Sequence, residues 1–286
     1  MLSITKNRKR IVLMESTLPL AIQPLLDAYL HGLEPFHSHC SGIYVTGSIA
    51  LGAFEEQASD IDVMALTQGE WSSFELKQLK TLHHHLIQAF PFGKRLEVCY
   101  APVRYLGVMR SGKQEDPVDP YPVMHDGVFS AASSGGLNAV TWWIIKHHGL
   151  RLLGPHRSEL PLDVTWKDVL STMQFNLDVY FARQAKRPYI YWSDVAVEFG
   201  VTNLCRIFTT IEEGELIAKA ESLVRWRDRL PERWQPLLDE AWRLRHHLRQ
   251  PSCYPHRLQR MRETLAFIQY GRERGHNALE RFSHVK

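Results

Sequence analysis

The segment from residue 47 to residue 62 constrains the fold more than any other part of the sequence. It reads GSIALGAFEEQASDID and lies between two β-rich runs. Asp60 and Asp62 stand two residues apart at the start of the second run, and side chains at positions i and i+2 of a strand point to the same face. The two carboxylates therefore converge, while Ile61 between them faces the opposite side as part of the core.

Three short β-rich runs and a helix predict that the first half of the chain is α/β. The runs are residues 43–46, 61–66 and 96–100, and each has about the length of an ordinary strand. Residues 71–90 place large apolar side chains at spacings of three to five, which is the pattern of an amphipathic helix. Glu97 lies in the third run between two apolar residues, so its carboxylate faces away from the apolar side.

The second half of the chain has the pattern of helices. A chain of 286 residues is long enough for about two domains. Residues 102–136 are rich in Pro, Gly, Ser and Asp, which is typical of a linking loop, and helical stretches follow. We therefore expect an α+β domain with a mixed sheet and flanking helices over residues 1–104, an interdomain segment over 105–136, and an all-α helical bundle over 137–286 that completes a cleft.

Three carboxylates on one surface would form a site for a hard cation. If the strand of Glu97 lies beside that of Asp60 and Asp62, a bound ion with oxygen ligands relieves their repulsion, and Mg²⁺ is the cellular default. One carboxylate can then accept a proton from an attacking hydroxyl group. Gly47 lets the backbone turn tightly, and the Ser48 hydroxyl beside it can face a phosphate. A D-x-D pair or a Gly-Ser pair alone usually marks a turn or a solvated edge, but their ordered combination indicates nucleotidyl transfer.

These motifs resemble a known family. The run GSIALGAFEEQASDIDVMAL, followed by a Leu-Glu-Val strand, is similar to the nucleotidyltransferase superfamily with the DNA polymerase β-type core. More narrowly, it resembles the aminoglycoside (3″)(9) adenylyltransferases, which modify streptomycin and spectinomycin and so give antibiotic resistance. Residues 152–155 match the Leu-x-Gly-Pro of that family, and residues 202–231 resemble its L-x-R-I-W, G-x-I-x-x-K and L-P motifs. The resemblance covers about residues 40–250.

The resemblance implies a Mg²⁺-dependent enzyme that transfers AMP from ATP to a hydroxyl group of a small molecule and releases pyrophosphate. By it, Asp60, Asp62 and Glu97 hold the metal, and Glu97 is also the general base. The residues implied for the nucleotide are Gly47, Ser48, Ser59, Asp60 and Lys219. Lys219 would reach the phosphates from the helical half and stabilise the departing pyrophosphate, with a solvated helix lysine as the alternative. Arg206 is either a phosphate contact or part of a structural ion pair.

A cationic aminoglycoside would need carboxylates on the acceptor side of the cleft. The acidic candidates are Asp116, Asp119, Asp126, Asp194 and Glu198, together with the cluster Glu212, Glu213 and Glu215. We prefer Asp194 and Glu198, which stand four apart on a predicted helix and follow aromatic residues at 189–192. Aromatic faces beside carboxylates suit a sugar ring that bears ammonium groups.

The chain departs from that family around the acceptor. It has no Trp between residues 72 and 141 to stack on streptomycin, and Leu137 and Asn138 stand near a position where the family has an acidic residue. Tyr121, His125 and Phe129 are the candidates to line the pocket instead. The identity of the acceptor is therefore left open, with a protein or RNA acceptor, or nucleotide binding without turnover, as the alternatives. An unused carboxylate cluster is destabilising, which argues against the last of these.

Charge and composition give no sign of a nucleic-acid or membrane partner. Lys and Arg number 34 against 31 Asp and Glu, a net charge of +3. The four cysteines lie far apart, which indicates free thiols in a reducing compartment, and the histidine clusters lack the spacing of zinc ligands. The apolar stretch after the basic residues 6–10 is broken by polar residues, and the uncharged segment 127–145 is too polar for a spanning helix. We expect a cytoplasmic monomer.

Overall fold

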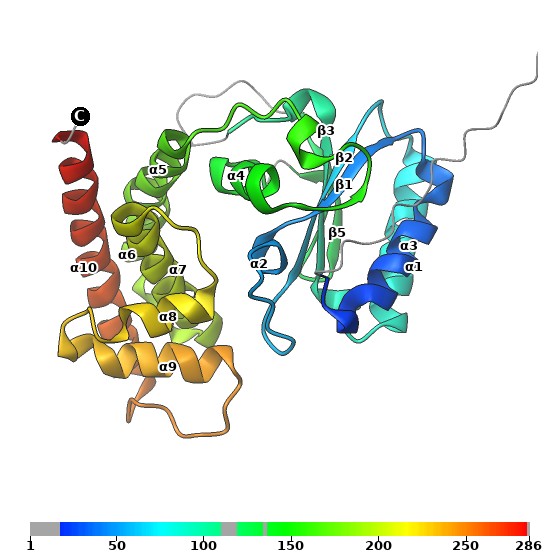
Figure 1. Cartoon of the computed structure of the whole chain (residues 1–286). Helices are drawn as coiled ribbons and strands as arrows, with labels where there is room; N and C mark the ends of the chain where they lie inside the picture. The colour runs from blue at the N-terminus through cyan, green and yellow to red at the C-terminus, as the bar shows by residue number, and fades with distance from the viewer. Residues whose placement is uncertain (1–17, 110–118, 134–135, 285–286) are drawn as a thin grey trace, which may run out of the picture.

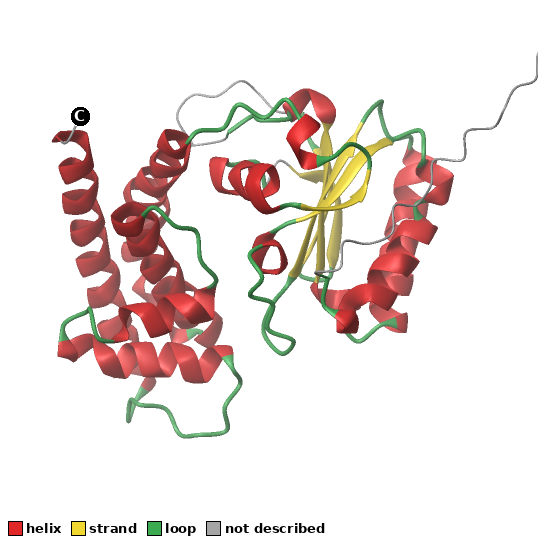
Figure 2. Ribbon diagram, viewed as in Figure 1, coloured by secondary structure: helices red, strands yellow, loops and turns green. Residues whose placement is uncertain are grey.

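A six-stranded sheet forms the centre of the first half of the molecule. The computed structural model describes residues 18–109, 119–133 and 136–284 (Figure 1). The strands are β1 (Cys40–Val45), β2 (Ile61–Thr67), β3 (Leu96–Pro102), β4 (Tyr121–His125), β5 (Val128–Ser133) and β6 (Leu150–Leu153). Their order is β5-β4-β3-β2-β1-β6, with β2 and β3 parallel and every other neighbouring pair antiparallel (Figure 2). The expected mixed sheet with flanking helices is confirmed.

Helices α1 (Gln23–Gly32) and α3 (Ser73–Ala89) lie on one side of the sheet (Figure 1). The side chain of Ser72 accepts the N–H of Glu75 while Glu75 accepts the N–H of Ser72, a capping box that fixes where α3 begins. Alternate residues of the central strands, such as Ile61 and Val63, pack with both helices in one hydrophobic cluster. The opposite face of β2 and β3 carries Asp62 and Glu97 near the start of the strands and a second hydrophobic cluster, which includes Met64, further along.

The segment expected as a linking loop contributes two strands instead. Asp126 and Gly127 join β4 to β5 with positive φ angles of 46° and 73°. A two-residue Asp-Gly loop with this backbone suits the twist of a β-hairpin, so the turn chemistry explains the difference. After helix α4 (Ala139–His148), the four-residue strand β6 pairs with β1, so the chain returns to the sheet beyond residue 137, where helices alone were expected.

Helix α4 (Ala139–His148) lies on the other side of the sheet, between the strands and the helical half (Figure 1). Its first turn is capped by Asn138, whose side chain accepts the N–H of Thr141. Trp142 is fully buried in a cluster with strand residues such as Met64, and its indole N–H donates to the Val108 carbonyl oxygen at 2.7 Å. The short helix α2 (Gly47–Ala50) contacts α4 on the same side.

The rest of the chain forms the helical half. Its helices are α5 (Trp166–Phe175), a π-helical turn (Asn176–Tyr180), α6 (Phe181–Ala185), α7 (Asp194–Glu213), α8 (Lys219–Arg227), α9 (Gln235–Arg245) and α10 (Arg257–His284). Short 3-10 helices cover Leu20–Ile22, Glu34–Phe36, Gly93–Arg95, Val103–Tyr105, Arg157–Glu159, Pro188–Trp192 and Glu232–Trp234. Helix α7 packs against α5, α8, α9 and α10 and carries much of the core. Within the described residues, no helix is both long enough and apolar enough to cross a bilayer.

Candidate active site

Asp62 and Glu97 are direct neighbours on adjacent parallel strands. They form one register pair of β2 and β3, on the face of the sheet that α4 partly covers. Ile61 and Leu96 point the other way and are fully buried. Asp60 lies one residue before β2 and is exposed. The predicted adjacency of the two strands, on which the site depends, is confirmed.

The three carboxylates concentrate negative charge at Asp62. Burial, and then the charges of Glu97 and Asp60, raise the pKa of Asp62 to about 6. Arg206 and Lys219, which come from the helical half, lower this pKa and so act on the same carboxylate. A hard cation bound by oxygen ligands would relieve the repulsion, so this donor set fits Mg²⁺.

The Glu97 carboxylate is bound to the β4–β5 turn. Its Oε2 lies 2.8 Å from Nδ1 of His125, and its Oε1 accepts the N–H of Asp126 at 3.3 Å. In the described part of the chain, no three side chains of the types that ligate metals are already gathered around one point. Glu97 would therefore rotate away from His125 to share an ion with Asp62. His125, a candidate for lining the acceptor pocket, instead contacts the Glu97 carboxylate.

Gly47 allows the close approach of the backbone to Asp62. Its φ is +61°, and a Cβ placed on it would lie 1.9 Å from Oδ2 of Asp62. The next residue, Ser48, has a buried hydroxyl without a hydrogen-bond partner among the described residues. A buried hydroxyl of this kind lacks an interaction that a ligand oxygen could supply. The structure thus places Gly47 against Asp62, and a contact of Gly47 and Ser48 with a phosphate stays a prediction.

Ser59 stabilises the loop that precedes Asp60. It is 3% exposed, and its hydroxyl accepts the N–H of Glu55 at 2.9 Å. The backbone N–H of Ser59 donates in turn to the Glu55 carbonyl oxygen at 2.8 Å. The described role of Ser59 is therefore to fix the loop, and a contact with a triphosphate stays a prediction.

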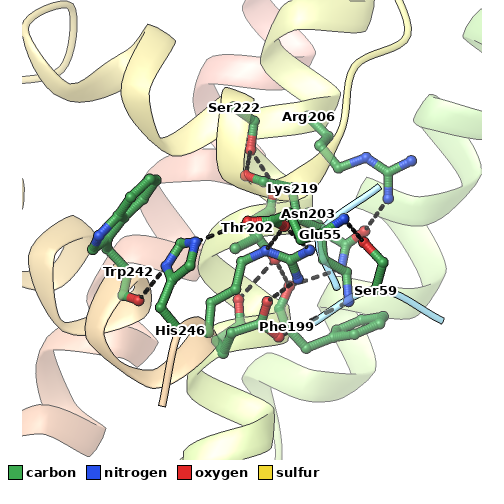
Figure 3. A network of polar contacts seen from close by, with 12 residues as sticks. Glu55, Ser59, Phe199, Thr202, Asn203, Arg206, Lys219, Ser222, Trp242 and His246 are labelled. Atoms are coloured by element: carbon green, nitrogen blue, oxygen red, sulfur yellow. Dashed lines mark hydrogen bonds and ion pairs between the residues drawn. The ribbon is translucent and has the colours of Figure 1, made fainter. Parts of the chain in front are cut away.

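An ion-pair network joins this loop to the helical half (Figure 3). We call it the interdomain clasp and define it as Glu55, Glu198, Arg245 and His246. Nε of Arg245 donates to Oε2 of Glu55 at 2.7 Å, and His246 Nε2 lies 2.8 Å from Oε1 of Glu55. A second guanidinium nitrogen of Arg245 bonds Glu198 at 3.2 Å, and the Arg245 side chain is only 6% exposed. This contact could not be predicted from the sequence, since no local pattern links residues so far apart.

Lys219 and Arg206 face the same region from the helical half (Figure 3). Nζ of Lys219 lies 3.9 Å from Oε2 of Glu198 and 5.4 Å from the centre of the Phe199 ring. Arg206 donates from Nε to the Ile217 carbonyl oxygen at 2.9 Å, and burial lowers its pKa. Within the described residues no carboxylate is within ion-pair distance of Arg206, so the predicted alternative of a structural ion pair is not seen.

The preferred acceptor pair, Asp194 and Glu198, is bound to other protein groups. Asp194 accepts from Arg260 at 2.5 Å, and Glu198 belongs to the interdomain clasp. Asp119 pairs with Arg104, and Asp116 lies outside the described residues. The cluster at 212–215 is bound by three arginines, Arg225, Arg229 and Arg274. Asp119, Asp194, Glu198 and the cluster at 212–215 are therefore paired with cations of this chain, and a contact of any of them with an acceptor stays a prediction.

A cavity of about 550 Å³ lies between α4, α5, the π-helical turn and α7. We call it the interhelical cavity. Arg206 and Phe199 belong to its wall, which places it beside the groups that act on Asp62. Tyr121 and Phe129, two candidates for lining the pocket, are instead packed in the cores on the two faces of the sheet. A second cavity of about 570 Å³ lies along α10, and Glu212 of the acidic cluster is the one predicted candidate among the described residues that line it.

Comparison with known protein families identifies the helical half. Residues 190–267 match the aminoglycoside adenylyltransferase C-terminal domain. The resemblance predicted from the motifs is thus confirmed in a region that includes Arg206 and Lys219. Comparison with curated proteins gives no significant match.

A solved structure has a similar fold. The crystal structure of the spectinomycin adenyltransferase AAD(9) from Enterococcus faecialis with ATP and spectinomycin is similar to this chain, with a TM-score of 0.63 and 13% sequence identity. The likeness covers 87% of this chain and 98% of that one. The protein therefore has the fold of an aminoglycoside adenylyltransferase, with a mixed sheet followed by a helical region.

Proposed function

We propose that this protein is a nucleotidyltransferase that transfers AMP from ATP to a hydroxyl group of a small molecule and releases pyrophosphate. The observation that carries the proposal is the Asp62–Glu97 register pair, which faces Arg206 and Lys219 from the other half of the molecule. Acidic groups suited to a metal and basic groups suited to phosphates thus meet at one place. The fold likeness to an adenylyltransferase supports the same reaction.

Each residue of the site has a task in this reaction. Asp60, Asp62 and Glu97 would hold Mg²⁺, which when bound neutralises charge on the nucleotide phosphates. Ser48 donates its unpartnered hydroxyl to a phosphate oxygen beside the close turn at Gly47. Lys219 binds the phosphates that leave as pyrophosphate.

Glu97 accepts the proton of the attacking hydroxyl group on a carboxylate oxygen once it has separated from His125. The hydroxyl oxygen forms a bond to the α-phosphorus of ATP as the bond from that phosphorus to the pyrophosphate oxygen breaks. In-line positioning of the two oxygens by a site built from both halves supplies much of the rate.

The family resemblance proposes an aminoglycoside of the streptomycin or spectinomycin type as the acceptor. The test incubates the protein with labelled ATP, Mg²⁺ and a panel of hydroxyl compounds that begins with these two antibiotics. Labelled product with a small molecule and release of pyrophosphate are the expected results. Label on protein or RNA would support a macromolecular acceptor, and ATP binding without transfer would support a nucleotide-binding protein.

Matched variants test the assignment of the carboxylates. We expect Asp62→Asn and Glu97→Gln to reduce AMP transfer by about a thousandfold, because they remove a metal ligand and the proton acceptor. Glu70→Gln changes an exposed carboxylate outside the site in the same way and should keep full activity. Undiminished transfer by the Glu97→Gln protein would refute the mechanism.

A further inference from the structure

The wall of the interhelical cavity is mostly apolar, with neutral polar groups and the charged side chain of Arg206. Aromatic and aliphatic side chains supply most of it, from both α4 and the helices of the second half. The aromatic groups include Tyr180, Phe181 and Phe199, and the neutral polar groups include Asn138, Thr141 and Asn176. A volume of about 550 Å³ is in the range of small-molecule sites. This wall offers ring contacts and neutral hydrogen bonds to a ligand.

Charge in and around the cavity is positive. Among the described residues that line it, Arg206 is the one charged group, and no carboxylate is included. Lys219 lies over the Phe199 ring at the same side. Glu198, which precedes Phe199 of the wall, bonds Arg245 and lies 3.9 Å from Lys219. A ligand's ammonium group that entered the interhelical cavity would lose its hydration and find no carboxylate partner in the described part of the wall. The guanidinium group of Arg206 would also repel it.

The cavity is also placed to hold the acceptor. Arg206 belongs to its wall and acts on the charge of Asp62, so the cavity borders the reacting groups. Residues of α4 also line the cavity, and α4 contacts α2, the short helix that begins with Gly47 and Ser48. If the phosphates occupy the cationic side near Arg206 and Lys219, the apolar remainder is left for the second substrate.

We propose that the acceptor is an uncharged molecule that carries a hydroxyl group on an apolar or aromatic framework, and that a polycationic aminoglycoside is a poor substrate. This inference rests on the proposed function, because it names the acceptor class of that reaction. The apolar framework packs on Phe181 and Phe199. The neutral amide and hydroxyl groups of the wall, such as Asn176 and Thr141, bond the polar groups of the acceptor.

Two matched probes test the acceptor class by binding, without ATP. The first is 4-nitrophenyl glucopyranoside, which is uncharged, and the second is its 6-amino-6-deoxy analogue, which differs by one ammonium group at pH 7. Titration calorimetry of the full-length protein should give a dissociation constant at least about tenfold lower for the uncharged probe, about 1.4 kcal/mol. Equal or tighter binding of the aminated probe would overturn the inference.

A carboxylate added to the wall should change this preference. Asn176→Asp is nearly isosteric, and Thr141→Asp places the same charge on the opposite wall, from α4. Each should reduce the preference for the uncharged probe over the aminated probe at least about tenfold. One folded variant of the two is enough for the test. Asn277→Asp on α10 makes the same chemical change at an exposed site outside the cavity and should leave the ratio as it is. An unchanged ratio in the folded cavity variants would contradict the proposal.

Turnover separates this inference from the proposed reaction. AMP transfer and pyrophosphate release are then measured for the same two probes, streptomycin and spectinomycin, with the Glu97→Gln protein as the inactive reference. Transfer to the uncharged probe in preference to the cationic compounds supports both proposals. Efficient transfer to streptomycin or spectinomycin alone would overturn the acceptor class and support the reaction. The expected binding ratio with no transfer to any compound would count against the proposed function alone.

Discussion

Gly47 shows how one residue sets the geometry of the site. We expect Gly47→Ala to lower the free energy of unfolding by at least about 2 kcal/mol, because the added methyl group would collide with Oδ2 of Asp62 at 1.9 Å in a backbone conformation that already disfavours alanine. Gly52→Ala is the matched control, because Gly52 has a similar φ of +70° and no atom within 4 Å of the added Cβ. It should cost about 1 kcal/mol. Denaturant unfolding measures both, and equal costs would show that Asp62 does not require glycine.

His83 is a buried histidine that makes stability depend on pH. It is 2% exposed, its Nε2 lies 2.7 Å from the Tyr100 hydroxyl, and burial lowers its pKa from 6.5 to about 4. Between those values the unfolded chain binds the proton and the folded chain does not. This residue should therefore cost about 3 kcal/mol of stability as the pH falls from 6.5 to 4, and nothing above that range.

Unfolding measured at several pH values checks the contribution of His83. His83→Gln should flatten the curve between pH 6.5 and 4, whereas His84→Gln, which alters an exposed neighbour on the same helix, should follow the wild-type curve. If the His83→Gln protein kept the wild-type pH dependence, the change of unfolding free energy between pH 6.5 and 4 would come from groups other than His83.

At the scale of elements, the interdomain clasp couples the loop before β2 to the end of α9. A double-mutant cycle with Glu55→Gln and Arg245→Gln should give a coupling free energy of about 1–3 kcal/mol, because the Arg245 side chain is 6% exposed and binds two carboxylates. The surface pair Arg227 and Asp239, 52% and 37% exposed, should give less than about 0.5 kcal/mol in the same cycle. Equal coupling in the two cycles would mean that the clasp contributes no more than a surface pair.

The elements of the first half could be predicted where the signal was local. The alternation of apolar and polar residues predicted β2 and β3 and placed Asp62 and Glu97 on the face opposite the core. In the structure the two strands pair in parallel, which makes Asp62 and Glu97 neighbours. The β4–β5 hairpin was missed although Asp126 and Gly127 carry the strongest short hairpin signal, because the Pro, Gly, Ser and Asp content of residues 102–136 as a whole favoured a loop. Gly214, with a φ of +73°, ends α7, and α8 begins at Lys219 after four non-helical residues.

At the scale of the whole molecule, the site depends on contacts that no sequence pattern encodes. Lys219 was predicted to face the phosphates only through the family motif. The clasp partners Glu55 and Arg245 come from opposite halves of the chain, and helix spacing does not reveal that Arg260 binds Asp194 and that Arg245 binds Glu198. A contact of Asp194 and Glu198 with the acceptor stays a prediction. Local sequence patterns therefore predict which carboxylates come together in the candidate site. The side chains on the acceptor side can be identified only from the tertiary packing.

Lys219 also provides a test that the two halves form one nucleotide site. Lys219→Met should weaken ATP binding about tenfold or more, because a charge-assisted contact to phosphate is lost. Without ATP the melting temperature should stay within about 2 °C, since Lys219 is 26% exposed and has only a 3.9 Å ion pair with Glu198. Lys167→Met, on the exposed side of α5, should bind ATP as the wild type does. Unchanged ATP affinity in Lys219→Met would remove the helical half from the nucleotide site.

The return of the chain to the sheet at β6 decides where the protein can be divided. A fragment that ends at residue 136 would leave the edge of β1 unpaired and uncover the sheet face on which Trp142 packs. An unpaired edge beside an uncovered apolar face is a template for aggregation. A fragment that extends past β6 would retain both the edge strand and α4. Anyone who separates the half that contains the sheet for binding studies, or exchanges helical halves between relatives, should therefore cut after Leu153.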